Sequence, residues 1–270
     1  MLYKGKTVYQ FTEEINDDVY FRFNRMNIRN KLFAQLPLPS KSILPVIGVH
    51  CNKSGVCNPS KETIAIMAGC CEKTVYNGLQ GLQKYPGFEM SQYVTSRGRK
   101  ANKYRIVPPS MDKKAQSFDF YKSIITGAIW QYLTPKAHAL YMVMRHYSFH
   151  DQHTYMSFEE DDEICDLGVM EMFASRKFDF CEAELDVLAE YAGIGLDTAG
   201  GAMEELIRYF LVEKIEEDEC PPWKVIIRPQ YHYVSESLNQ SIRERYTPKK
   251  EKLPVKYIEP KSEKTYPLSI

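Results

Sequence analysis

The sequence aligns with itself, and this internal repeat constrains the fold more than any other feature. Residues 61–82, KETIAIMAGCCEKTVYNGLQGL, align without gaps with residues 185–206, LDVLAEYAGIGLDTAGGAMEEL. Two further pairs of segments match in the same order, an apolar block upstream and an aromatic-rich extended stretch before it: 38–52 with 134–148, and 19–23 with 118–124. Three matching segments in one order indicate a duplicated structural unit.

Each unit has the pattern of three helices followed by a β-hairpin. In the first copy we expect helices at about 40–50, 60–68 and 72–84 and a hairpin at 88–107. Ser60 can cap the second helix, and Gly69 provides the backbone freedom needed at a tight corner between two helices. The predicted fold class is therefore mainly α with small β-hairpins (α+β), arranged as two similar domains.

Residues 37–107 resemble the winged helix-turn-helix domain of phage and plasmid replication proteins and related regulators. The shared marks are N-K-S-G-x-x-x-P-S at 52–60, A-x-x-x-G at 65–69 and the T-V that opens the third helix at 74–75. A weaker copy covers residues 118–229. The resemblance implies two tandem winged helix-turn-helix domains, each with a hairpin wing. Cys71 departs from the pattern, because such domains usually have Ser or another capping residue at this position.

The charge of the chain is divided unevenly, although its net charge is zero. Residues 1–110, the predicted DNA-binding domain, contain 16 basic and 7 acidic residues. The predicted second domain, 111–230, includes the acidic segment 151–220, with 4 basic and 21 acidic residues. Residues 231–270 are rich in Lys and Pro and predict a flexible basic tail. This asymmetry indicates that one half of the chain meets a polyanion and the other does not.

The third helix of the first copy has the side chains that a DNA-reading helix needs. At 100° per residue, Val75, Leu79 and Leu82 share one inward stripe, and the opposite face is polar. Lys can pair with guanine or phosphate, while Asn and Gln can pair bidentately with adenine. An ordinary solvated helix face would also be polar. The predicted DNA-binding residues of this helix are Lys73, Thr74, Tyr76, Asn77, Gln80 and Lys84.

The hairpin that follows decides between these two interpretations, because it too is basic. Five basic residues fall within nine positions, and four of them are predicted to contact phosphates or a minor groove. These four are Arg97, Arg99, Lys100 and Lys103, and the fifth is Arg105. A basic helix and a basic hairpin on the elements that winged helices use to bind DNA favour DNA binding.

The corresponding face of the second copy has the opposite character. Its outward helix positions are Asp197, Gly201, Glu204 and Arg208, and its hairpin contains EKIEEDE at 213–219. Such a face would repel phosphate. We therefore expect the second domain to form a homodimer, to dock a replication-protein partner, or to fold back over the basic face of the first domain.

The predicted function is sequence-specific binding of double-stranded DNA. The role that the resemblance favours is that of an origin-binding replication initiator or replisome-loading protein of a phage, plasmid or other mobile element. One alternative is a winged-helix transcriptional regulator with the same DNA-reading surface. Another is a protein-interaction scaffold that does not bind DNA. Nucleotide-binding, hydrolase and metalloprotease motifs are absent from the sequence, so we expect neither catalysis nor a cofactor.

Several His and Cys residues could suggest a metal site, but their spacing does not support one. His146, His150 and His153 are interpreted as a solvated helix end without a fourth ligand. His50 with Cys51, Cys57, Cys70 and Cys71 matches no zinc spacing, so we expect no metal. The polar N-terminus is not a signal peptide, and the longest apolar run, 139–144, is too short to cross a bilayer. We therefore expect a cytoplasmic protein without a membrane partner.

Overall fold

In the computed structural model the chain divides into two compact units, which are described separately. The structure describes residues 2–3, 6–10, 20–107, 117–127, 129–149, 178–215, 223–227 and 231–234. One unit consists of residues 1–15 and 230–270, and the other of residues 16–229. The boundaries that the sequence suggests near residues 110 and 230 stay a prediction.

The smaller unit joins the two ends of the chain in one antiparallel sheet. Its strands are β1 (Leu2–Tyr3), β2 (Lys6–Gln10) and β12 (Tyr231–Val234), in the order β1-β2-β12. In the pairing of β2 with β12, Gln10 lies opposite Tyr231. Strand β12 falls inside the tail predicted to be flexible, and the rest of that tail lies outside the described residues.

The first half of the larger unit contains the helices and the hairpin expected for the first copy. Its elements are β3 (Tyr20–Asn24), α1 (Arg25–Arg29), α2 (Leu38–His50), β4 (Val56–Cys57), α3 (Lys61–Met67), α4 (Glu72–Leu82), β5 (Phe88–Val94) and β6 (Lys100–Ile106). The three strands β4, β6 and β5 form an antiparallel sheet in that order. The predicted helices and hairpin are confirmed within a few residues.

Local sequence explains where these helices begin and how closely they pack. Ser60 caps α3, since its hydroxyl accepts a hydrogen bond of 2.9 Å from the backbone N–H of Thr63. Gly69 adopts φ +65° at the corner between α3 and α4, as expected for glycine. In α4, a Cβ at Gly78 would lie only 2.7 Å from Cδ1 of Ile43 on α2. The two helices therefore approach each other closely because this position lacks a side chain.

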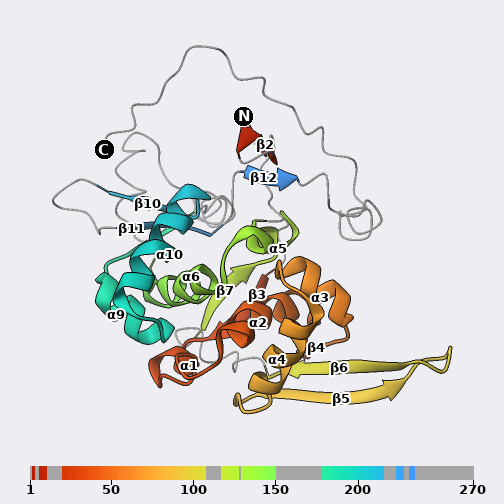
Figure 1. Ribbon diagram of the computed structural model, residues 1–270. Coiled ribbons are helices and arrows are strands. Elements are labelled where there is room, and N and C mark those ends of the chain that lie inside the picture. Colours follow the sequence, from red (N-terminus) through yellow and green to blue (C-terminus); the bar gives the residue numbers. More distant parts are fainter. Residues whose placement is uncertain are drawn as a thin grey trace, which may run out of the picture. The chain divides into compact units, whose positions relative to one another are not determined.

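The second half repeats this order of elements. Its elements are β7 (Ser117–Tyr121), α5 (Ser123–Thr126), the 3₁₀ helix η2 (Trp130–Tyr132), α6 (Pro135–Tyr147), β8 (Ser148–Phe149), β9 (Phe178–Cys181), α9 (Leu185–Ala192), α10 (Leu196–Arg208), β10 (Val212–Lys214) and β11 (Trp223–Ile226). Its antiparallel sheet has the order β10-β11-β9-β8. Helices α6, α9 and α10 correspond to α2, α3 and α4 (Figure 1). The extra segment of the second copy, 150–177, lies outside the described residues.

The two halves contact each other reciprocally. Strands β3 and β7 pair antiparallel, with Phe21 opposite Phe120. Gly69 lies against the backbone carbonyl of Gln131, just before α6, while Gly193 lies against that of Ala34, just before α2. Each corner glycine thus meets the segment that precedes the first long helix of the other half. Such exchange of equivalent contacts is what two copies related by an approximate two-fold axis would make.

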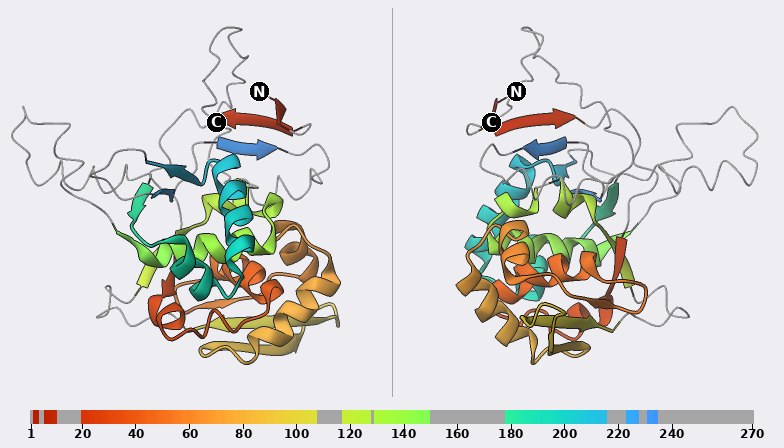
Figure 2. Two further views of the ribbon diagram at one scale, coloured as in Figure 1. Left: turned by 60° about the vertical axis from the view of Figure 1, so that its left-hand side comes forward. Right: turned by 90° about the vertical axis from the view of Figure 1, so that its right-hand side faces the viewer.

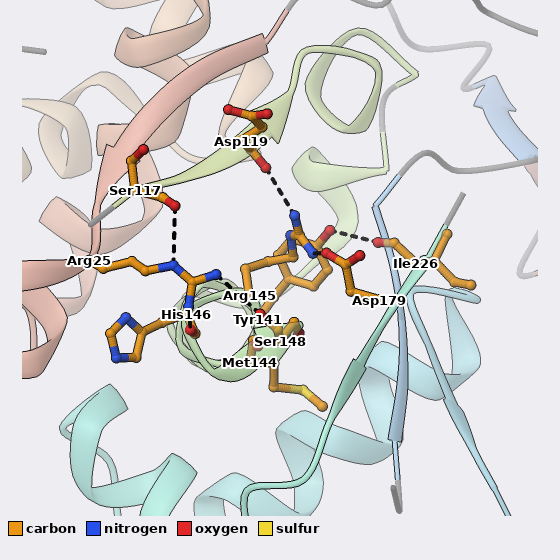
Figure 3. A network of polar contacts seen from close by, with 10 residues as sticks. All are labelled: Arg25, Ser117, Asp119, Tyr141, Met144, Arg145, His146, Ser148, Asp179 and Ile226. Atoms are coloured by element: carbon orange, nitrogen blue, oxygen red, sulfur yellow. Dashed lines mark hydrogen bonds and ion pairs between the residues drawn. The ribbon is translucent and has the colours of Figure 1, made fainter. Parts of the chain in front are cut away.

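Two arginines hold α6 and its neighbouring strands in place: the partly buried Arg25, which reaches from the first half to the second, and the buried Arg145, which acts within the second half (Figure 3). Arg25 on α1 donates hydrogen bonds to the backbone carbonyls of Ser117 (3.2 Å) and Ser148 (3.1 Å) and to that of His146. Arg145 on α6 forms an ion pair of 2.5 Å with Asp179 on β9, and both side chains are almost fully buried. A buried charge pair tolerates little displacement of either partner, so these contacts fix α6 against the strands around it.

The helices and small antiparallel sheets confirm the predicted α+β class. Most residues of α2 and α6 are buried, and these two helices lie in the interior of the larger unit (Figure 2). The assignment of the two halves as winged helix-turn-helix domains stays a prediction. Within the part of the chain that the structure describes, no helix has the length and apolar character needed to span a bilayer.

Candidate nucleic-acid interface

Helix α4 presents the predicted reading residues to solvent. Val75, Leu79 and Leu82 are buried, as the 100° pattern predicts. Five of the six predicted residues are exposed: Lys73, Tyr76, Asn77 and Gln80 on α4, and Lys84, which lies just beyond it because the helix ends at Leu82 and not at residue 84 as predicted. Their side chains can therefore reach a ligand without any rearrangement of the core.

Thr74, the sixth predicted residue, is only partly exposed and faces the start of its own helix. Its hydroxyl lies 3.3 Å from Sγ of Cys71, the N-cap residue of α4. Hydrogen bonds from the side chain and backbone of Thr74 hold the pKa of the Cys71 thiol below its ordinary value. Thr74 thus supports the beginning of the helix, and it lies less favourably for base contact than the other five.

A lysine of the neighbouring helix adds a positive charge beside this face. Nζ of Lys61, on α3, lies 5.6 Å from the ring centroid of Tyr76, which is 51% exposed. A cation at this distance from an aromatic face is attracted to it. Lys61 is not among the DNA-binding residues predicted from the sequence, because only the packing of α3 against α4 brings it near Tyr76.

The hairpin of β5 and β6 has a tight tip that presents basic side chains. Gly98 adopts φ +72°, and the backbone N–H of Thr95 donates a hydrogen bond of 2.8 Å to the carbonyl of Arg99. The hydroxyl of Thr95 accepts a further hydrogen bond, of 3.1 Å, from the backbone N–H of Arg99. All four predicted hairpin residues are exposed: Arg97, Arg99, Lys100 and Lys103. Arg105 instead pairs with Glu89 across the hairpin, at 3.5 Å.

The hairpin is connected to the helices through the chain at one end and through a side-chain hydrogen bond further along β5. The turn at 83–87 leads directly from α4 into β5, and the hairpin extends away from the helices (Figure 1). Nδ2 of Asn58, in the loop before α3, donates a hydrogen bond of 2.9 Å to the hydroxyl of Tyr93 on β5. Asn58 and Tyr93 therefore hold the hairpin in position relative to α3, a role that the sequence did not predict.

The electrostatic character of this surface is strongly positive. From Cys71 to Val107 the sequence contains seven basic residues and two acidic ones, Glu72 and Glu89. Since Glu89 pairs with Arg105, its charge is partly neutralised within the hairpin. A surface of this kind attracts phosphate groups and releases their counterions on binding.

The corresponding helix of the second half presents a different surface. On α10, Asp197, Gly201, Glu204 and Arg208 are exposed, as predicted from the repeat. Glu213, at the start of the second hairpin, forms an ion pair of 2.9 Å with Lys224. The remainder of the acidic run, 216–219, lies outside the described residues. Helix α10 therefore lacks the concentration of positive charge that α4 and its hairpin have.

The histidine and cysteine groups considered as metal sites fall partly within the described residues. His150 and His153 lie outside the described residues. Burial, together with the charges of Arg25 and Arg29, lowers the pKa of His146 to about 4, so this side chain is neutral at pH 7. Sγ of Cys51 lies 3.2 Å from Sγ of Cys57. Among the described residues, no three or more His, Cys, Asp or Glu side chains lie close enough together to hold a metal ion.

Comparison of this chain with protein-family models, with curated proteins and with solved structures gave no match.

Proposed function

We propose that this protein binds double-stranded DNA in a sequence-specific manner through α4 and the β5–β6 hairpin. These elements would belong to the first of two tandem winged helix-turn-helix domains. One observation carries the proposal: α4 exposes amide and lysine side chains and leads directly into a basic hairpin. The equivalent helix α10 instead exposes both acidic and basic side chains. The same repeat thus has two different surfaces, and only the first suits a polyanion.

In this proposal α4 lies in the major groove. Asn77 and Gln80 have the paired donor and acceptor atoms that recognise adenine, and Lys73 can pair with guanine or phosphate. Arg97 and Arg99, at the hairpin tip, contact the phosphate backbone or the adjacent minor groove. The helix would supply base specificity and the hairpin most of the salt-dependent affinity.

The role we propose for this DNA binding is replication initiation or replisome loading in a phage, plasmid or other mobile element. It rests on the resemblance of residues 37–107 to replication proteins of such elements. A transcriptional regulator would use the same surface, and the two differ in what the second half recruits.

Selection of bound sequences from a random pool of duplex DNA tests the proposal. We expect enrichment of one short motif by the full chain, and loss of that enrichment in a variant with Asn77→Ala and Gln80→Ala together. A matched variant with Gln35→Ala, an exposed glutamine that lies before α2 and outside α4 and the hairpin, should select the same motif as the wild type. Absence of any salt-dependent DNA binding would contradict the proposal and favour the interaction scaffold.

A further inference from the structure

Helix α10 exposes large apolar side chains on the face that its counterpart α4 uses for polar ones. Leu196 is 54% exposed and Ile207 is 38% exposed, and Phe210, directly after the helix, is 44% exposed. Leu196 and Ile207 are separated by about three helical turns, so they lie on one stripe of the helix. Exposed apolar residues aligned along a single helix indicate a contact with another helix.

Two adjacent glycines lie between these apolar residues, and the packing of the described residues does not require either of them. Among the residues that the structure describes, a Cβ at Gly200 or Gly201 would meet nothing within 4 Å. In α4, by contrast, a Cβ at Gly78 would lie 2.7 Å from Ile43 and 2.9 Å from the carbonyl of Pro39. Glycine inside a helix is unfavourable without such a reason, and close approach of another molecule would provide one for the pair in α10.

The residues of this face are arranged symmetrically about the level of Ala202 along the helix axis, although the side chain of Ala202 itself is buried on the opposite face. Leu196 and Ile207 lie six and five residues from it, and Asp197 and Arg208 lie five and six residues from it. At 100° per residue, Leu196, Gly200 and Ile207 fall within about 40° of one another, and Asp197 and Arg208 lie together on one side of them. A face with this symmetry is complementary to a second copy of itself.

We propose that two copies of this protein associate through α10. The two helices pack antiparallel, and the two-fold axis between them crosses the exposed face at the level of Ala202. In this arrangement Leu196 meets Ile207 of the partner subunit, and Asp197 meets Arg208 of the partner subunit. Glu204 lies opposite Gly200 of the partner subunit, where there is no side chain to crowd it. By symmetry the apolar contact and the ion pair each occur twice, and the glycines allow the two helices to approach closely.

A second copy fits this face better than DNA does. Asp197 and Glu204 would repel phosphate, while Leu196 and Ile207 would gain nothing from it. Self-association does not depend on DNA binding. If the proposed function also holds, the dimer presents two α4 helices in a symmetric pair, and the selected DNA site is an inverted repeat.

Charge reversal tests the pairing of Asp197 with Arg208 of the partner subunit. Sedimentation of the full chain without DNA measures the dimer fraction as a function of concentration. We expect Asp197→Arg alone and Arg208→Asp alone each to raise the dissociation constant at least tenfold, and the double variant, with both reversals, to restore it. A wild type that is monomeric at all concentrations, or single variants that associate as well as the wild type, would overturn the proposal.

A matched pair of glycine variants tests the close approach. Gly200→Gln and Gly201→Gln make the same chemical change at neighbouring open positions of one helix, but only Gly200 lies on the stripe with Leu196 and Ile207. We expect Gly200→Gln to shift the protein to monomer and Gly201→Gln to leave most of the dimer intact, with circular dichroism confirming that both fold. Equal effects of the two substitutions, or no effect of either, would overturn the proposed contact.

Because sedimentation is measured without DNA, its outcome is independent of the proposed function. The wild type and the monomeric variants should have the same affinity for a single half-site, since α4 and its hairpin are unchanged. Loss of half-site binding in a monomeric variant would contradict the separation of the two surfaces.

Discussion

The side-chain ammonium group of Lys41 donates a hydrogen bond of 2.6 Å to the backbone carbonyl of Ala192, at the C-terminal end of α9. It donates a second one, of 2.9 Å, to the carbonyl of Ala34. Lys41 belongs to α2 of the first half and is 1% exposed, so a buried cation from one half caps a helix of the other. A positive charge at this helix end is favourable, but its burial lowers the pKa of Lys41 to about 8.

The depressed pKa of Lys41 predicts how stability depends on alkaline pH. Between pH 8 and about 10.5 the unfolded chain binds a proton at Lys41 that the folded chain does not, so this residue makes stability rise with pH, by about 1.4 kcal/mol per unit. In Lys41→Met this contribution is absent. Chemical denaturation of both proteins from pH 7.5 to 10.5 should show that the unfolding free energy of the wild type increases relative to that of Lys41→Met as pH rises. A difference independent of pH would contradict the assigned titration.

A buried histidine lowers the stability of the folded protein at acidic pH. Nε2 of His138 donates a hydrogen bond of 2.7 Å to the carbonyl of Trp130, and burial lowers the pKa of His138 to about 3. As pH falls from 6.5 towards 3, the unfolded chain takes up a proton that the folded chain excludes, so stability falls.

His138→Gln keeps a hydrogen-bond donor but cannot titrate. We expect its unfolding free energy to fall less steeply between pH 6 and 4 than that of the wild type, with about one proton fewer taken up on unfolding. His50 and His146, whose pKa burial lowers to about 4 in each case, still contribute in both proteins. Equal slopes for the two proteins would show that His138 does not remain neutral in the folded state.

The corner glycine Gly69 is predicted to be more sensitive to substitution than the hairpin glycine Gly98. Both adopt positive φ, +65° and +72°, so an alanine at either position costs about 1–2 kcal/mol from backbone strain. At Gly69 the added Cβ would also collide with the carbonyl of Gln131, whereas at Gly98 it would meet nothing within 4 Å. Thermal unfolding should therefore show a clearly larger loss for Gly69→Ala. Equal losses would contradict the close contact between the two halves.

Single substitutions on the DNA-reading surface should separate base recognition from phosphate attraction. Asn77→Ala is expected to weaken binding to the selected site by about 1–3 kcal/mol and to relax preference at one base position. Arg99→Ala should weaken binding to all sequences alike and reduce the slope of log affinity against log salt by about one. Binding titrations at several salt concentrations, with Gln35→Ala as the control, distinguish the two effects. Unchanged binding in both variants would place the reading surface elsewhere.

Local features of this protein were predictable from the order of its residues. The period of the apolar residues Val75, Leu79 and Leu82 placed α4, and the capping residue Ser60 placed the start of α3. Helices of this length form where neighbouring residues in the chain agree on one buried face, so a short stretch of sequence contains the information.

Features that depend on contacts between distant residues were not predictable. Lys61 lies beside Tyr76 because α3 packs against α4, and Asn58 donates a hydrogen bond to Tyr93 because the loop before α3 lies along β5. The short distance of 3.3 Å between the hydroxyl of Thr74 and Sγ of Cys71 likewise follows from the helix geometry at the start of α4.

The sequence by itself determined the repeat, the helices and hairpins of each copy, and the difference in charge between the two outward helix faces. Only the tertiary structure decided that the halves pack reciprocally through Gly69 and Gly193 and that Lys41 is buried between them. The physical reason is that helix periodicity and charge are properties of neighbouring residues, whereas burial of a lysine depends on carbonyl groups as distant in the chain as that of Ala192.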